Sequence, residues 1–97
     1  MSDSEGTQVA NNRERSQFEI HVEDGRLAGL ARYRGSEGVR EFFHTEVGDD
    51  FEGQGIGGKL ARAALDETRS EGLKVLATCP FIKGWIEKHP DYQDLLA

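Results

Sequence analysis

The chain has 97 residues, with 18 acidic and 12 basic side chains and a formal net charge of -6 at pH 7. This length fits one domain, and the acidic balance argues against a nucleic-acid backbone as the main partner. Cys79 is the one cysteine, so an internal disulfide is excluded and a cytoplasmic protein is predicted. No apolar run approaches the roughly 18 residues of a membrane helix. The first residues have neither the basic nor the apolar region of a signal peptide.

The first part of the chain is predicted to be a disordered tail followed by an antiparallel meander. Residues 1–16 are polar apart from Val9-Ala10, so we expect the tail there and a single domain over residues 17–97. Alternating apolar residues over 18–22, 27–34 and 39–47 predict three strands. Asp24-Gly25 is typical of a two-residue hairpin turn, and the glycines of residues 35–38 mark the next turn.

The second part of the chain changes to a helical period. An apolar repeat of about 3.6 residues begins at Gly55 and predicts an amphipathic helix that ends at Gly72. Residues 73–78 form a short apolar strand, which a strand–helix–strand crossover makes parallel to the preceding strand. Pro80 favours the start of a second helix, and His89-Pro90 ends it. The predicted fold class is therefore α+β: a short antiparallel meander, a helix, a parallel strand and a C-terminal helix.

The loop before the first helix, residues 52–59, reads Glu-Gly-Gln-Gly-Ile-Gly-Gly-Lys. Its glycines allow a tight turn, and the N–H groups and dipole of the following helix favour a phosphate. Gly53-x-Gly55-x-x-Gly58 fits a dinucleotide fingerprint, but no carboxylate lies about 20 residues further on for the ribose. Leu60 stands where a P-loop needs Ser or Thr to hold magnesium. A turn that serves only helix packing stays open as an alternative.

Further blocks accompany this loop in a fixed order. They are Phe43-His44-Thr45-Glu46-Val47, Gly53-Gln54-Gly55-Ile56-Gly57-x-x-Leu60, Ala64-Leu65, Glu71-Gly72-Leu73-Lys74-Val75, Cys79-Pro80-Phe81 and His89-Pro90-Asp91-Tyr92. With these blocks, from about Phe18 to Tyr92, the chain resembles the GNAT superfamily of acetyl-CoA-dependent N-acetyltransferases. Within that superfamily it is most similar to the small, single-domain, YidJ-like branch.

The resemblance implies an N-acetyltransferase that moves an acetyl group from acetyl-CoA to an amine. It places the pyrophosphate of CoA on the N–H groups of Gln54, Gly55, Ile56, Gly57 and Gly58, with Lys59 and Arg62 supplying positive charge nearby. The alternative for Lys59 and Arg62 is that both lie on a solvated helix face. It also implies strand-like hydrogen bonds to the pantetheine arm where the strand ending at Glu46-Val47 separates from the strand ending at Thr78.

Cys79 and His44 are the candidate catalytic residues. Cys79 lies where a strand ends and a helix begins, a place that favours thiolate, and His44 lies near the end of the neighbouring strand and can act as a base. Transfer then proceeds through acetyl-Cys79, or directly with His44 deprotonating the amine. The alternative is that both side chains are structural. Tyr92 matches a late tyrosine that protonates CoA in many superfamily members, although we expect it to anchor the tail. No metal-ligand spacing is present.

Two departures from the superfamily pattern support other hypotheses. Glu52 stands where the motif usually has Arg or Gln, and because a carboxylate repels a pyrophosphate we expect it to point away. The predicted elements include none of the N-terminal helices that form much of the acceptor pocket in larger members. An acyl-CoA-binding module with little or no catalysis is therefore the second hypothesis, and a structural domain that binds no CoA is the third. The acceptor is unidentified, and an exposed sheet edge allows a monomer or a weak homodimer.

Overall fold

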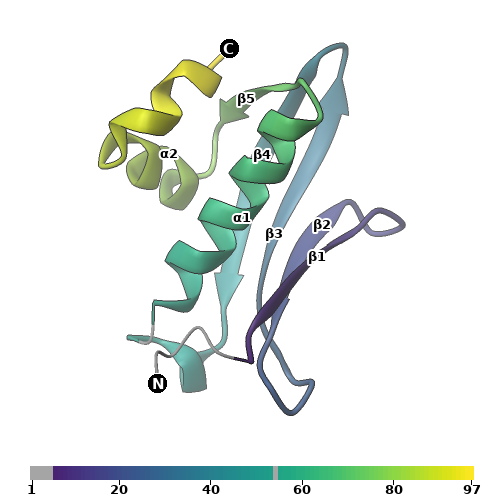
Figure 1. Ribbon diagram of the computed structural model, residues 1–97, viewed down its shortest axis with the longest axis vertical. Coiled ribbons are helices and arrows are strands. Elements are labelled where there is room, and N and C mark those ends of the chain that lie inside the picture. The colour runs from purple at the N-terminus through teal and green to yellow at the C-terminus, as the bar shows by residue number, and fades with distance from the viewer. Residues whose placement is uncertain (1–5, 54) are drawn as a thin grey trace.

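The computed structural model describes residues 6–53 and 55–97. A five-stranded sheet in the order β1-β2-β3-β4-β5 is crossed on one face by helix α1 (Figure 1). The strands are β1 (Gln8–Asn12), β2 (Gln17–His21), β3 (Leu27–Ser36), β4 (Val39–Val47) and β5 (Lys74–Ala77). The helices are α1 (Ile56–Ser70) and α2 (Pro80–Glu87), with 3-10 turns η1 (Asp49–Phe51) and η2 (Pro90–Leu95). The predicted α+β class is confirmed.

Strand β1 corrects the prediction of a disordered tail over residues 1–16. Residues 8–12 pair antiparallel with β2 along their whole length. Asn11 accepts a hydrogen bond from the Tyr33 hydroxyl at 2.7 Å and donates one to the Glu67 carboxylate of α1 at 2.9 Å. These long-range contacts compensate for the low apolar content of the strand. Residues 1–5 of the predicted tail lie outside the described part of the chain.

The meander of β2, β3 and β4 is antiparallel, and two irregularities shape it. The pairing of β2 with β3 shifts register after Ile20, so that Ala28 is an extra residue on β3. The pairing of β3 with β4 shifts between Arg32 and Tyr33, so that Phe43 is an extra residue on β4. An extra residue in one strand is a β-bulge, and it exchanges the two faces for the residues that follow it.

The crossover after β4 carries the chain over the sheet and back. Helix α1 ends at the C-cap Glu71, and Gly72 adopts the left-handed φ of +75° that such a helix end requires. The chain then returns as β5, which pairs parallel with β4. Both the capping glycine and the parallel strand were predicted from the sequence and are confirmed.

The C-terminal elements close the other edge of β5. Helix α2 begins at Pro80, and η2 follows directly after His89-Pro90. The final residue, Ala97, donates its backbone N–H to the Val75 carbonyl at 2.9 Å. The buried core lies between the sheet and the helices, and its largest fully buried apolar side chains are Phe18, Phe42, Ile20, Leu60, Leu65, Ile82, Ile86 and Val75.

Candidate active site

Strand β4 continues beyond the end of its neighbour β5. β4 has nine residues and β5 has four, and their pairing ends at Phe42 and Ala77. The Phe42 carbonyl accepts hydrogen bonds from the N–H groups of both Thr78 and Cys79, at 3.1 and 3.0 Å. The chain then turns into α2, so within the described part of the chain the last residues of β4 have no strand beside them on this edge.

The open edge of β4 presents backbone hydrogen-bonding groups. The N–H of Gly48 donates to the Ala28 carbonyl of β3. Alternation along β4 directs the N–H groups of Glu46 and His44 towards β3 as well. The N–H and C=O groups of Thr45 and Val47 therefore face the open edge. An extended ligand can bind there as an added strand would.

The glycine loop ends at an exposed helix N-terminus. Gly53 and Gly55 have left-handed φ values of +80° and +74°, which favour glycine. The first helical hydrogen bond of α1 runs from Lys59 N–H to the Gly55 carbonyl at 3.1 Å, and the N-cap has no side-chain hydrogen bond. The N–H groups of residues 56–58 consequently stay available for an anion, which the helix dipole also favours. Gln54, predicted to belong to this site, lies outside the described residues.

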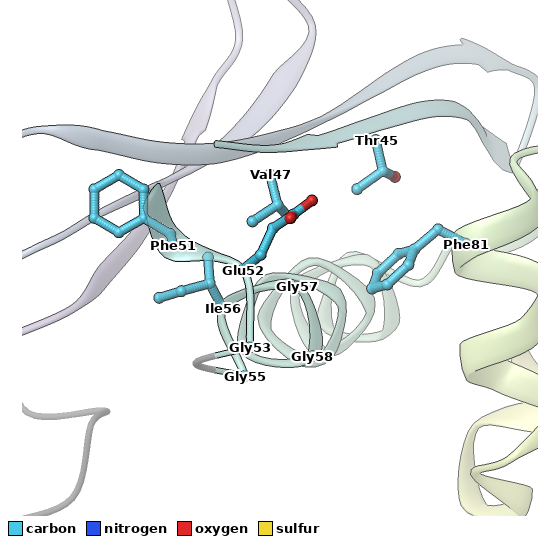
Figure 2. A pocket seen from close by; sticks show the side chains of 10 residues that line it. All are labelled: Thr45, Val47, Phe51, Glu52, Gly53, Gly55, Ile56, Gly57, Gly58 and Phe81. Atoms are coloured by element: carbon cyan, nitrogen blue, oxygen red, sulfur yellow. The ribbon is translucent and has the colours of Figure 1, made fainter. Parts of the chain in front are cut away.

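A cavity of about 540 Å³ joins the glycine loop to the open edge of β4 (Figure 2). It is lined by Thr45, Val47, Phe51, Glu52, Gly53, Gly55, Ile56, Gly57, Gly58 and Phe81. Gly57 allows the close approach of α2, because a Cβ atom at this position would lie 2.7 Å from the Phe81 ring. The predicted loop residues Gly55, Ile56, Gly57 and Gly58, together with Val47, thus line one cavity.

Glu52 does not point away from this cavity, so that prediction is wrong. Its side chain lines the cavity and extends from the loop towards β4 (Figure 2). Glu52 therefore puts a negative charge in the cavity beside the glycine loop, where a pyrophosphate was predicted to bind.

Cys79 lies behind the wall of the cavity. The residue is 4% exposed and occupies the N-cap position of α2. Its Sγ donates a hydrogen bond to the Thr45 hydroxyl at 3.3 Å, and Thr45 in turn lines the cavity. The thiol is thus one side chain removed from the open edge of β4.

His44 does not form a pair with Cys79. Its Nε2 lies 2.9 Å from the Glu46 carboxylate, and both side chains are exposed. Because Thr45 faces α1, strand alternation places His44 and Glu46 on the opposite face of the sheet. The side chain of Glu46 accordingly lies outside the large cavity. The two candidate catalytic residues are separated by the sheet itself.

Neither Lys59 nor Tyr92 lines the main cavity. The Nζ atom of Lys59 is buried and makes no hydrogen bond with the described part of the chain, and the residue lines a second cavity next to α2. The Tyr92 hydroxyl donates to Asp66 at 2.7 Å and accepts from Arg62 at 3.2 Å. Burial and the bond to Asp66 raise the pKa of Tyr92. Its hydroxyl is therefore committed to α1.

Sequence reasoning missed Thr45, Phe51 and Phe81 as cavity residues. Thr45 and Phe81 each stood in a quoted block, but their orientation depends on the β4 bulge and on the packing of α2. Within residues 6–53 and 55–97, no group of three or more His, Cys, Asp or Glu side chains is placed to hold a metal ion. No helix in these ranges is long and apolar enough to cross a bilayer.

The model of the GCN5-related N-acetyl-transferase family matches residues 17–95. Protein NATD1 of Xenopus tropicalis is 36% identical over 92 residues, which cover 93% of this chain and 84% of that protein. Protein NATD1 of Gallus gallus is 38% identical over 85 residues, which cover 86% of this chain and 76% of that protein. The chain therefore belongs to the GCN5-related N-acetyltransferase (GNAT) family.

Solved structures agree with this membership. A GCN5-like protein of Staphylococcus aureus superposes with a TM-score of 0.73 at 29% identity, covering 96% of this chain and 90% of that one. The ribosomal-protein-S18-alanine N-acetyltransferase of Escherichia coli shares the fold, with a TM-score of 0.65 at 21% identity over 80% of this chain and 54% of that one. The predicted superfamily is confirmed, while the YidJ-like branch stays a prediction.

Proposed function

We propose that this chain transfers an acetyl group from acetyl-CoA to an amine acceptor in the cytoplasm. The observation that carries the proposal is the single cavity that joins the first turn of α1 to the open edge of β4. A ligand with an anionic diphosphate and an amide-containing arm matches both ends of this cavity. The N–H groups of residues 56–58 suit the diphosphate, and the backbone groups of Thr45 and Val47 suit the amides.

The residues at the β4 end of the main cavity, which we also call the groove, allow two routes of acetyl transfer. Acetyl-CoA supplies the reactive thioester. In the direct route, the amine nitrogen attacks the acetyl carbon, the C–S bond breaks, CoA leaves as a thiolate, and His44 takes the proton that the amine loses. In the covalent route, Cys79 Sγ bonds to the acetyl carbon, the C–S bond to CoA breaks, and the Cys79 proton passes to the departing CoA sulfur. The amine then attacks the acetyl carbon, the C–S bond to Cys79 breaks, and the proton that the amine loses returns to Sγ.

The described contacts favour the direct route. The side-chain partner of Cys79 is the Thr45 hydroxyl, which is a poor base. His44 is exposed, paired with Glu46 and on the face opposite α1, where an acceptor can reach it without crossing the groove. Under this proposal the sheet separates the donor side from the acceptor side, and the gap between β4 and β5 connects them.

Thermal unfolding in the presence of acetyl-CoA, CoA, ATP and NAD tests the ligand. A ligand at about 100 times its dissociation constant adds roughly 2.7 kcal/mol of stability, which should raise the midpoint by about 10–20 °C in a domain of this size. We expect this shift with the two CoA species only. A shift with ATP or NAD alone would refute the proposal.

Release of free CoA across a panel of amines tests catalysis. We expect His44→Gln to reduce turnover and Cys79→Ala to retain it, with no acetyl group on the protein by mass spectrometry. An acetyl adduct on Cys79 that the amine removes would establish the covalent route instead.

The acyl-CoA-binding module is the second candidate function. The acceptor side favours it, because the only helical element before α1 in the described part of the chain is the 3-10 turn η1, which leaves little to enclose an amine. It predicts a thermal shift with CoA species and no CoA release with any amine in the panel.

A further inference from the structure

A second, smaller cavity opens beside the glycine loop. It has a volume of about 280 Å³ and is lined by Gly55, Gly58, Lys59, Arg62, Trp85 and His89. Gly55 and Gly58 line the main cavity as well, so both cavities border the first turn of α1. A ligand whose diphosphate lies on that turn can therefore extend another group into the second cavity.

The charge of this second cavity is opposite to that of the chain. The whole sequence has a formal net charge of -6, yet among the described residues the cavity lining includes two cations and no carboxylate. The main cavity, by contrast, contains Glu52. Local positive charge in an acidic protein indicates a site for an anion.

Lys59 provides the second observation. Its Nζ atom is buried and has no hydrogen-bond partner in the described part of the chain. A buried ammonium group without a partner is costly, and such groups are normally paired. An anionic oxygen in the adjoining cavity would satisfy it.

The side chains of the remaining walls contact one another. The Arg62 guanidinium lies over the Trp85 ring at 5.4 Å and donates to the Tyr92 hydroxyl at 3.2 Å, which leaves other N–H donors of its five. The Trp85 and His89 rings stack with centroids 3.7 Å apart. His89 Nδ1 lies 2.6 Å from the Trp85 carbonyl, and because a carbonyl only accepts, this nitrogen carries the proton. The ring orientation is thereby fixed.

We propose that the second cavity binds the 3′-phosphate of CoA, with Lys59 and Arg62 as its contacts. The proposal deepens the proposed function and depends on it. It assigns Lys59 to the phosphate monoester and leaves the diphosphate to the backbone of residues 56–58. The chain then discriminates CoA from dephospho-CoA, which lacks only the 3′-phosphate.

Dissociation constants for CoA and dephospho-CoA, measured by isothermal titration calorimetry, test this assignment. A charge-assisted hydrogen bond corresponds to a factor of about ten or more in affinity, so we expect CoA to bind at least about tenfold more tightly than dephospho-CoA. Lys59→Gln should weaken CoA by about that factor and leave dephospho-CoA unchanged. The matched control Lys83→Gln removes the same charge from an exposed position of α2 outside both cavities, and it should keep the wild-type ratio.

Two results would overturn the assignment. Equal binding of the two ligands by the wild type would show that the 3′-phosphate is not recognised. Equal weakening of both ligands by Lys59→Gln would place Lys59 on the diphosphate. Absence of binding of either ligand is a different outcome, because it rejects the proposed function itself.

Discussion

Arg40 is a buried charge, and its removal is the sharpest test of how this fold is stabilised. The residue is 4% exposed and joins β4 to the C-terminal turn of α1. Its guanidinium donates to both carboxylate oxygens of Glu71 at 3.1 and 3.2 Å and to the Thr68 hydroxyl at 3.0 Å. It also lies over the Tyr33 ring, 4.4 Å from the centroid.

Arg40→Met keeps an apolar stem and removes the charge. Breaking a buried pair by deleting one partner costs about 3–5 kcal/mol. The Glu71 side chain is 26% exposed and lies 3.5 Å from Arg13, so its charge keeps water and a second partner. We therefore expect a loss of about 2–3 kcal/mol in the free energy of unfolding, or roughly 10–20 °C in midpoint.

The loss of stability in Arg40→Met should depend on pH, and the lowered pKa of Glu71 sets the direction of that dependence. The hydrogen bonds from Arg40 hold the pKa of Glu71 below its ordinary value of 4.5. A carboxyl whose pKa is lowered by folding stabilises the protein above its unfolded pKa, and this contribution is lost as the pH falls through the folded pKa. The difference in stability between wild type and Arg40→Met should therefore be largest near neutral pH and should narrow below about pH 4.5.

Urea denaturation at neutral and acidic pH measures both quantities. The double variant Arg40→Met with Glu71→Gln should recover part of the loss, because the unpaired carboxylate is then removed as well. A loss below about 1 kcal/mol at neutral pH would contradict the assignment of a buried ion pair. A difference that does not change with pH would show that Glu71 is not the group involved.

Three further predictions concern the groove and its surroundings. Glu52→Gln should tighten CoA binding several-fold in calorimetry, and unchanged affinity would mean that the carboxylate leaves the groove when CoA binds. Gly55→Ala should lower the free energy of unfolding by about 1–2 kcal/mol, because the φ of Gly55 is +74°. Among the described residues no atom lies within 4 Å of a Cβ at either Gly55 or Gly84, and the φ of Gly84 is not left-handed. The control Gly84→Ala should therefore not lower the free energy of unfolding. Tyr92→Phe should cost about 0.5–1.5 kcal/mol through the lost bond to Asp66 and leave turnover unchanged, whereas a tenfold fall in kcat would make Tyr92 a catalytic acid.

The order of elements from β2 to α2 was predictable because local signals agree there. The alternation of β2, the Asp24-Gly25 turn, the apolar stripe of α1 and Gly72 each act over a few residues. Strand β1 has no such signal. The folding of residues 8–12 into a strand depends on pairing with β2 and on the hydrogen bonds of Asn11 to Tyr33 and Glu67. These two partners lie 22 and 56 residues away from Asn11 in the sequence.

The face of the sheet on which His44 lies could not be predicted from the sequence, for a related reason. Simple alternation from the buried Phe42 puts His44 and Glu46 on the core side of β4. The bulge at Phe43 exchanges the faces, so that Thr45 and Val47 line the cavity instead. A bulge of this kind depends on the pairing with β3, and neither strand carries a glycine at the position where the register shifts.

The position of the groove, in contrast, follows from strand length, which the sequence does encode. Pro80 cannot donate to a strand ladder, and it starts α2 soon after β5. Strand β4 continues to Val47 before Gly48 interrupts it. Two parallel strands of unequal length must leave an open edge, and the glycine loop returns the chain to that edge at the start of α1. The binding groups are then mostly backbone N–H and C=O groups, so their placement depends on where strands and helices end more than on which side chains they carry. The glycine loop is the exception, because left-handed φ values and the approach of Phe81 both require residues without a Cβ atom.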